Sequence, residues 1–188
     1  MLSMTRHRVD QAQWCPSPNY NERPDPTDIS LLVIHNISLP PGQFGGPYIE
    51  DLFLNRLSAD AHPYFRDIHQ LTVSSHFLVR RDGSLLQFVD CDQRAWHAGV
   101  SEFAGRENCN DFSLGIELEG ADDIPYEPPQ YGTLVALTAL LQARYPAITD
   151  RRITGHQDIA PGRKTDPGPA FDWTEYRRRL AAFKEERT

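Results

Sequence analysis

The sequence predicts a single α/β domain with a central mixed sheet flanked by helices. Short apolar runs alternate along the chain with longer segments of helical periodicity, which is the pattern of this fold class. A length of 188 residues suits one domain, and no repeat or linker divides it. We expect one domain over residues 1–188, with an N-terminal arm at 1–28, a core at 29–183 and a tail at 184–188.

The first predicted strand is the apolar run LLVIH, which follows an arm rich in proline, asparagine and aspartate and ends at His35. Prolines and glycines crowd the next segment, residues 38–48, so we expect irregular backbone there. This segment is either a loop over a cleft or an ordinary surface loop. A hairpin is predicted around Asp82 and Gly83, because both residues tolerate the positive φ of a type I′ turn.

A further strand is predicted in FSLGIELEG, residues 112–120. Leucine and isoleucine alternate there with Gly115, Glu117 and Glu119. Successive side chains of a strand point to opposite faces, so the apolar side chains would lie on one face and the carboxylates on the other.

Two helices are predicted in the C-terminal part of the chain. Residues 128–145 carry an apolar stripe at helical spacing, and Pro146 ends it. A last helix begins near Asp172, whose side chain is expected to form a capping box with Glu175. The aromatic and leucine side chains that follow are expected to lie in the core.

Composition and charge exclude several function classes. The 26 acidic and 19 basic residues give a net charge of -7, so a duplex-binding surface would need a local basic patch, and we set nucleic acid aside. No apolar run suits a signal peptide or a membrane span, so we expect a cytosolic protein without a membrane partner. Three cysteines without a CxxC spacing indicate reduced thiols.

Two histidines and one aspartate form a candidate metal site. His35 ends a predicted strand, His156 follows the short run RIT and a glycine, and Asp166 lies in a loop stiffened by proline. Two imidazoles and a carboxylate, with one position left for water, is a coordination that hydrolytic zinc uses. Spacing alone also allows the alternative that these are surface or hydrogen-bonded side chains. Three histidines in polar surroundings are expected to have no direct function: His7, His62 and His69.

Four longer segments carry a resemblance to a known family: LLVIHNISLPPGQFGGPY, RAWHAGVS, NDFSLGIELEG and GHQDIAPGRKTDPGPAFDW. They resemble the cytosolic 1,6-anhydro-N-acetylmuramyl-L-alanine amidases of the AmpD type, which belong to the type-2 amidase superfamily and are related to peptidoglycan recognition proteins. The resemblance extends from about CPSPNY to AFDW. It implies an amidase-like α/β fold and an enzyme that hydrolyses the amide between N-acetylmuramic acid and L-alanine.

The same resemblance implies a role for each candidate residue. It places Zn²⁺ on His35, His156 and Asp166, because no cysteine, the third ligand of other branches, follows His156. It makes Glu117 the general base and Lys164 the group that stabilises the oxyanion. Glu119 shares the strand face of Glu117, so the residues alone barely separate the two carboxylates.

Several other residues are candidates for contact with the substrate. Trp96 and His97 lie in a motif of the family and are expected to line the sugar pocket, although a structural role is equally compatible with His97. Asn36 is expected either to bond the substrate or to brace the metal ligands. Arg106 is our candidate for the carboxylates of the peptide, and His76 is expected to be a buried, hydrogen-bonded side chain. Six further arginines are alternatives to Arg106: Arg80, Arg81, Arg94, Arg151, Arg152 and Arg163.

The resemblance implies an enzyme of cell-wall recycling that acts on small anhydro-muropeptides, and we expect this enzyme to be a monomer. In bacteria with that circuit, it would lower the pool of muropeptides that induce β-lactamase. Two alternatives stay open. One is an amidase that acts on intact peptidoglycan, and the other is a muropeptide-binding module without turnover.

Overall fold

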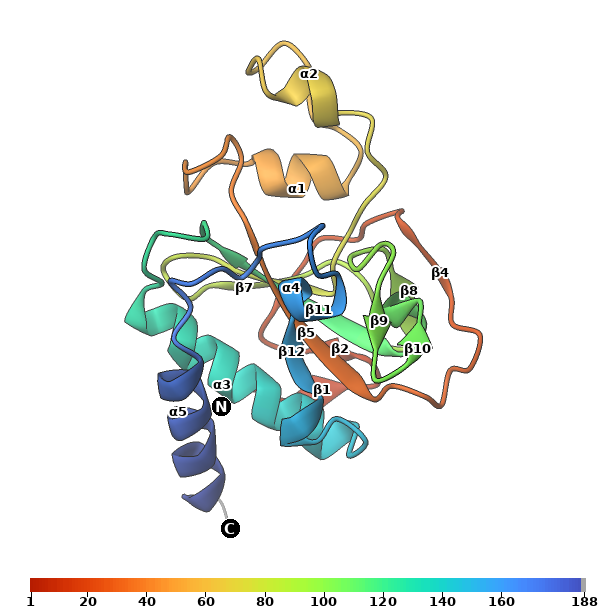
Figure 1. Ribbon diagram of the computed structural model, residues 1–188, viewed down its shortest axis with the longest axis vertical. Coiled ribbons are helices and arrows are strands. Elements are labelled where there is room, and N and C mark those ends of the chain that lie inside the picture. Colours follow the sequence, from red (N-terminus) through yellow and green to blue (C-terminus); the bar gives the residue numbers. More distant parts are fainter. Residues whose placement is uncertain (187–188) are drawn as a thin grey trace.

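The computed structural model describes residues 1–186, and its centre is a six-stranded mixed sheet (Figure 1). The strands lie in the order β12, β5, β11, β6, β7, β3. In chain order they are β3 (Gln13–Trp14), β5 (Leu31–Ile37), β6 (Phe77–Val79), β7 (Leu85–Gln87), β11 (Ser113–Glu119) and β12 (Ile153–Gly155). Neighbours from β12 to β6 are parallel, whereas β7 is antiparallel to β6. The predicted α/β domain with a mixed sheet is confirmed.

Helices lie on both sides of this sheet, and short strand pairs lie at its margins. The helices are α1 (Tyr48–Phe53), α2 (Phe65–Ile68), α3 (Pro128–Arg144), α4 (His156–Ile159) and α5 (Trp173–Glu185), with 3₁₀ turns η1 (Cys109–Asp111) and η2 (Asp150–Arg152). The marginal pairs are β1 (Met4–Thr5) with β2 (Arg8–Val9), β4 (Tyr20–Glu22) with β8 (Gln93–Ala95), and β9 (Glu102–Phe103) with β10 (Arg106–Glu107).

Alternation along β5 and β11 separates the two faces of the sheet. The even-numbered apolar residues of these strands, such as Leu32 and Ile116, pack in the core against α3 and α5. Leu31 and Val33 point the other way and pack with Phe112 and with Ile159 at the end of α4. His35 and Glu117 share this second face, since they are separated from Val33 and Gly115 by two positions.

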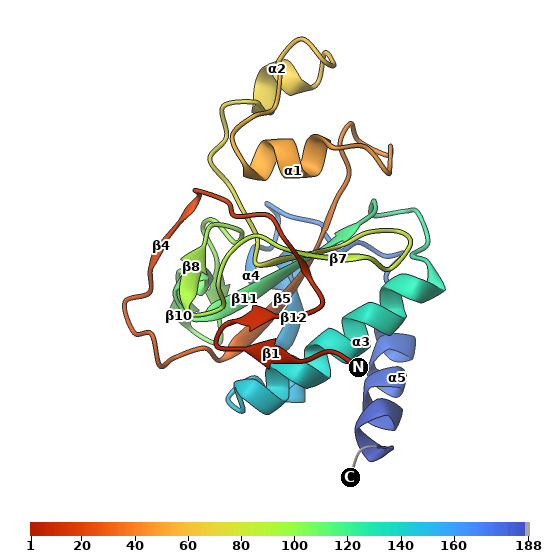
Figure 2. The ribbon, with the colours of Figure 1, turned by 180° about the vertical axis from the view of Figure 1, so that it is seen from behind.

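The two predicted C-terminal helices are confirmed as α3 and α5, which pack together on one face of the sheet (Figure 2). The apolar stripe of α3 is buried, and Tyr145 caps its end before Pro146. Asp172 caps α5 by accepting the backbone N–H of Glu175. The reciprocal half of the predicted capping box differs, because the Glu175 carboxylate accepts from two arginines of the next turn instead.

The segment between β5 and β6 forms a lobe over the opposite face of the sheet, at the top of Figure 1. We define this lobe as residues 48–73, which include α1 and α2. Phe53 and Phe65 are its anchors, and they pack with Leu86 and Phe88 of the β7 region. The arm before β5 holds the lobe from below, because the Asn19 amide donates to the carbonyl oxygens of Phe53 and Val73.

The structure of the two chain ends can be compared with the predicted N-terminal arm and C-terminal tail. Residues 1–28 contain four short strands, and the hairpin of β1 and β2 lies against α3 (Figure 2). At the other end α5 continues to Glu185, while residues 187–188 of the predicted tail lie outside the described residues. None of the described helices is long and apolar enough to cross a membrane.

Candidate active site

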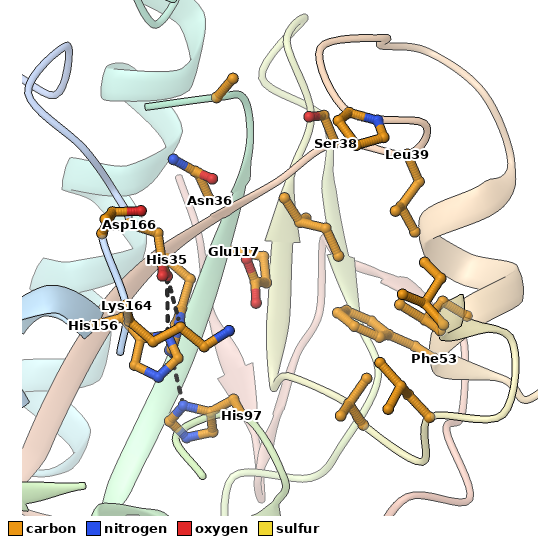
Figure 3. Close-up of a pocket in the computed structure, with 18 of the residues that line it drawn as sticks. His35, Asn36, Ser38, Leu39, Phe53, His97, Glu117, His156, Lys164 and Asp166 are labelled. Carbon is orange, nitrogen blue, oxygen red and sulfur yellow. Dashed lines mark hydrogen bonds and ion pairs between the residues drawn. The ribbon is translucent and has the colours of Figure 1, made fainter. Parts of the chain in front are cut away.

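The carboxyl ends of three parallel strands bring the predicted metal ligands together. His35 lies near the end of β5, directly opposite Glu117 of β11, and His156 follows the last residue of β12. Parallel strands end at the same edge of a sheet, which is where α/β proteins commonly form their sites. Asp166 reaches this edge from the loop after α4 (Figure 3).

The three candidate ligand atoms lie at nearly equal separations. His35 Nδ1 is 3.0 Å from His156 Nδ1 and 3.1 Å from Asp166 Oδ2, and His156 Nδ1 is 3.0 Å from the same oxygen. Zinc bonds of about 2.0–2.1 Å place tetrahedral ligands about 3.3 Å apart. Two nitrogens and one carboxylate oxygen therefore fit a single Zn²⁺ in both chemistry and spacing.

The protonation of these groups also suits a cation. Burial lowers the pKa of His35 to about 4, so its imidazole is neutral near pH 7. Burial acts to raise the pKa of Asp166, but the close contacts with the His156 and His35 rings outweigh it and hold that pKa below its usual range. One neutral imidazole and one carboxylate are the forms of these groups that bind a cation.

The Asp166 loop is held by hydrogen bonds as well as by its prolines. The Asp166 carbonyl accepts the backbone N–H of Gln157, and the Pro167 carbonyl accepts from the Tyr126 hydroxyl and the Asn36 amide. Next in the chain, Gly168 is pressed against the backbone of residue 122. These contacts fix the carboxylate relative to β5 and α4.

Gly168→Ala is expected to lower the free energy of unfolding by at least about 1–3 kcal/mol. Gly168 has a φ of +77°, and an added Cβ would lie 2.3 Å from Asp122 Cα. Gly162→Ala is a matched control, since Gly162 has a φ of +75° but open space around the added atom. Chemical unfolding of the metal-free protein measures both variants, and equal losses would contradict the role of the Asp122 contact.

The two carboxylates of β11 have different surroundings. Glu119 is 2% exposed, and its oxygens accept from the backbone N–H groups of Gly45 and Arg81 and from the Arg80 guanidinium. Glu117 is 8% exposed, and its Oε2 has no hydrogen-bond partner within the described residues. Glu119 is therefore occupied in holding the loop before α1, while Glu117 faces the cavity.

Glu117 and Lys164 lie on the same cavity as the candidate metal ligands (Figure 3). Burial, together with the nearby Asp166 carboxylate, raises the pKa of Glu117 well above its usual value, and the Lys164 charge opposes this shift. A carboxyl group with a raised pKa is suited to accept and return a proton near neutral pH. Lys164 comes from the exposed loop after α4, and Figure 3 shows its side chain extending across the cavity.

The cavity has a volume of about 720 Å³ and two unlike walls. One wall carries the polar groups described above. The opposite wall belongs to the lobe and the loop before it, with Leu39 and Phe53 facing the polar groups in Figure 3. Of the two alternatives for residues 38–48, the structure therefore has the loop beside a cleft, because Ser38, Leu39, Pro41 and Gly42 line it.

The remaining predicted residues divide between the cavity and other places. Asn36, Trp96 and His97 line the cavity, but the Asn36 amide donates to Asp122 and to the Pro167 carbonyl, which is a bracing geometry. Arg106 lies elsewhere. Its guanidinium pairs with Asp28 and covers the ring of Phe112, so the structure does not bring it to the other site residues.

His76 is fully buried and hydrogen-bonded, as predicted. Its Nδ1 accepts the backbone N–H of Gly115, and its Nε2 lies 3.0 Å from the Gln93 carbonyl oxygen. Burial lowers the pKa of His76 to about 3, so the ring is neutral. His76 therefore braces β11 instead of binding a ligand.

Sequence reasoning did not identify two kinds of cavity residue. Arg163 was one of six unranked arginines, and its guanidinium lies at the cavity on the carbonyl oxygens of Ala98 and Val100. Tyr64 and Leu71 of the lobe also line the cavity, and both are unusually exposed for apolar side chains.

The fold and the site define a class of protein: single-domain α/β hydrolases whose reactive groups gather at the carboxyl edge of a mixed sheet. A family model described as N-acetylmuramoyl-L-alanine amidase matches residues 25–169. The chain belongs to the N-acetylmuramoyl-L-alanine amidase family.

Individual relatives place the chain within that family. It is 58% identical over 171 residues to the 1,6-anhydro-N-acetylmuramyl-L-alanine amidase AmpD of Salmonella typhimurium strain SL1344, covering 91% of each chain. A crystal structure of a selenomethionine AmpD derivative superimposes with a TM-score of 0.91 at 55% identity, covering 94% of this chain and 98% of that one. The predicted resemblance to the AmpD type, and with it the predicted enzyme class, is confirmed.

A third comparison is with a structure that holds a substrate. In it, the Escherichia coli amidase AmiD is bound to anhydro-N-acetylmuramic acid-L-Ala-D-γ-Glu-L-Lys. The TM-score is 0.58 at 28% identity, over 94% of this chain and 65% of that one.

Proposed function

We propose that the protein is a zinc-dependent amidase that cleaves the amide bond between the lactyl group of anhydro-N-acetylmuramic acid and L-alanine in muropeptides. The observation that carries the proposal is the convergence of two imidazole nitrogens and a carboxylate oxygen within 3.1 Å of one another, on a cavity that also holds Glu117 and Lys164. The relatives named AmpD act on this bond according to their names.

In this proposal the zinc ligands are His35, His156 and Asp166. When bound, zinc supplies a Lewis acid for the carbonyl oxygen and lowers the pKa of water from 15.7 to about 7. His156 Nε2 lies 3.0 Å from the Ala98 carbonyl oxygen, which can only accept, so that nitrogen carries the proton. The Nδ1 lone pair of His156 is then available to the metal.

Glu117 is the proposed proton carrier. Its unpaired Oε2 is available to take a proton from the attacking water. The same carboxyl group then returns that proton to the nitrogen of L-alanine as the amide bond breaks, so the leaving group departs as a neutral amine. The raised pKa of Glu117 favours both transfers near neutral pH.

Lys164 is the proposed stabiliser of the oxyanion. Its ammonium carries a positive charge into the cavity, where the carbonyl oxygen becomes negative in the transition state (Figure 3). A single such donor is typically worth about 3–4 kcal/mol. The backbone N–H groups of Arg163 and Lys164 both donate to the Ala160 carbonyl, which supports a fixed position for this part of the loop.

The substrate we propose is a soluble anhydro-muropeptide. The apolar wall of the cavity suits the less polar side of the sugar, and Trp96, whose indole N–H is fixed on Asn21, offers a flat surface beside it. Peptide carboxylates need a cation, because the net charge of -7 repels them. Arg163 is better placed for this role than Arg106, because its guanidinium lines the cavity and forms no ion pair within the described residues, whereas Arg106 pairs with Asp28.

The proposed setting is cell-wall recycling in the cytosol by a monomer. There the enzyme would shorten the lifetime of anhydro-muropeptides and so reduce β-lactamase induction in bacteria that use them as a signal. Hydrolysis of a small soluble substrate is compatible with a cavity of about 720 Å³.

Release of peptide from a purified soluble anhydro-muropeptide and from intact sacculi, at equal concentrations of muramyl-peptide bonds, separates this function from its alternatives. We expect rapid cleavage of the soluble substrate, slow cleavage of sacculi, and about one zinc per chain. Faster release from sacculi would favour an amidase for intact peptidoglycan. Binding of the muropeptide without release, in a protein loaded with zinc, would favour a binding module.

A further inference from the structure

We propose that His97 is a positioning residue of the metal site, which holds the ring of His35 so that its Nδ1 presents a lone pair to the metal. The inference rests on the proposed role of His35 as a zinc ligand. His97 Nδ1 lies 2.9 Å from His35 Nε2, on the side of the ring away from the other two ligands. The two rings stand at 89° with centroids 5.0 Å apart, so the hydrogen bond also restricts the tilt of His35.

His156 shows why His35 needs such a partner. A neutral imidazole carries one proton, and it can coordinate a metal through Nδ1 only when that proton sits on Nε2. The Ala98 carbonyl secures this tautomer for His156, because a carbonyl accepts and never donates. His35 has no carbonyl in that position. Its Nε2 faces another imidazole, which can play either role.

Ser113 is the second hydrogen-bond partner of His97. The other ring nitrogen of His97, Nε2, lies 3.2 Å from Ser113 Oγ on β11, and this hydroxyl oxygen can accept a hydrogen bond. A neutral imidazole carries a single proton, which in His97 can lie on Nε2, facing Ser113. With that proton on Nε2, His97 donates to Ser113 and accepts from His35. The three groups then form one chain that leaves His35 Nδ1 unprotonated.

Gly115 provides the space for the His97 ring. A Cβ at position 115 would lie 2.6 Å from His97 Cγ, far inside van der Waals contact. The flanking residues Leu114 and Ile116 are large and fully buried on the other face of β11. The His97 ring packs against the backbone of Gly115 and leaves no room there for a side chain. The glycine at position 115 is therefore independent evidence that the position of His97 matters.

The backbone of His97 is held as closely as its ring. Asn110 Oδ1 accepts the backbone N–H groups of both His97 and Ala98. The same short loop therefore carries the partner of His35 and the partner of His156. If the His97 side chain only contacted the substrate, its loop would not need to contact both histidine ligands.

The test compares two substitutions of His97, one that keeps the ring and one that keeps the hydrogen-bond acceptor. His97→Phe keeps a ring of similar shape and removes the acceptor, whereas His97→Asn loses the ring but places Oδ1 where Nδ1 was. Zinc affinity is measured on the full chain by competition with a chromophoric chelator. We expect affinity to fall about 10- to 100-fold in His97→Phe, which is the usual effect of losing such a partner, and to recover most of this loss in His97→Asn. A packing role predicts the reverse order.

Gly115→Ala is a second variant that alters no polar side chain. Its Cβ displaces the His97 ring, so we expect a loss of zinc affinity similar to that in His97→Phe. Ala143→Gly on the exposed side of α3 serves as a control for general destabilisation, and its zinc affinity should match that of the unaltered protein. In the zinc-loaded unaltered protein, ¹⁵N-edited imidazole spectra should show both His35 and His97 protonated at Nε2.

Three results would overturn the proposal: unchanged zinc affinity in His97→Phe with a raised KM, weaker affinity in His97→Asn than in His97→Phe, or a proton on His97 Nδ1 in the zinc-loaded protein. The first would assign His97 to the substrate instead. Failure of the unaltered chain to bind zinc would refute the proposed function itself, and it is recognised before any variant is compared. The spectra keep the test decisive even if a variant does not fold.

Discussion

Asp166→Ala is expected to abolish zinc binding and amide hydrolysis together. The substitution removes the carboxylate from the set of three candidate ligands. It leaves two imidazoles, whose Nδ1 atoms lie 3.0 Å apart, without a third ligand. Catalytic zinc sites keep three protein ligands and one open position, so two ligands fall short of what the ion requires. The loss of zinc affinity should exceed the roughly 10- to 100-fold cost of an altered outer partner.

The measurement is metal content after gel filtration, paired with the rate of peptide release from anhydro-muropeptide. Asp123→Ala is a matched control. Asp123 carries an exposed carboxylate, and it directly follows Asp122, whose backbone contacts Gly168 in the Asp166 loop. Chelation of the unaltered protein should reproduce the loss of activity, and added zinc should reverse it. A metal-free sample of the unaltered protein that retains its full rate would contradict the zinc mechanism.

The central strands and the last two helices could be predicted from the sequence because their patterns are local. LLVIH carries enough apolar and β-branched residues to indicate a buried strand, and in the structure it belongs to strand β5, which lies between β12 and β11. The stripe of α3 spans several turns, so its period is readable. The order of the strands was not readable, since the neighbours β5 and β11 are far apart along the chain.

The lobe shows the opposite case. Helices α1 and α2 have 6 and 4 residues, which is too short for a helical period to appear in the sequence. Their positions depend on distant contacts, such as those of Phe53 and Phe65 with the β7 region and of Asn19 with the lobe backbone. The wall of the cavity that the lobe forms therefore could not be derived from local sequence patterns.

Within the site, the chemistry of the candidate residues could be predicted from the sequence. The hydrogen-bond and ion-pair partners of each residue could not. His35 stood at a predicted strand end, and His156 followed the short run RIT, so the residue types pointed to a metal site before the fold was known. Nothing local distinguished Glu117 from Glu119, because the partners that occupy Glu119 come from two other segments of the chain, at Gly45 and at Arg80 and Arg81. Arg106 has the right charge for a carboxylate, but Asp28 is the carboxylate that it meets.

Glu117→Gln is expected to keep the zinc and lose about 10²- to 10⁴-fold in kcat, which is the usual contribution of a general base. The amide has nearly the same shape as the carboxyl group, so the cavity stays intact. It cannot accept the proton of the attacking water, however, because the amide nitrogen has no lone pair to offer and the amide oxygen is a very weak base. Metal content, KM and kcat are measured on one preparation, and we expect the change to fall on kcat.

Glu119→Gln is the matched control, since it makes the same change two residues along the same strand. Its carboxylate binds two backbone N–H groups and the Arg80 guanidinium, so the loss of charge should reduce the free energy of unfolding by about 1.5–3 kcal/mol. Turnover below the melting temperature should largely persist, because neither oxygen of Glu119 is free to take a proton. A collapse of kcat in Glu119→Gln beside a normal rate in Glu117→Gln would move the general base to the other carboxylate. The two variants thus separate chemistry from anchoring on a single strand face.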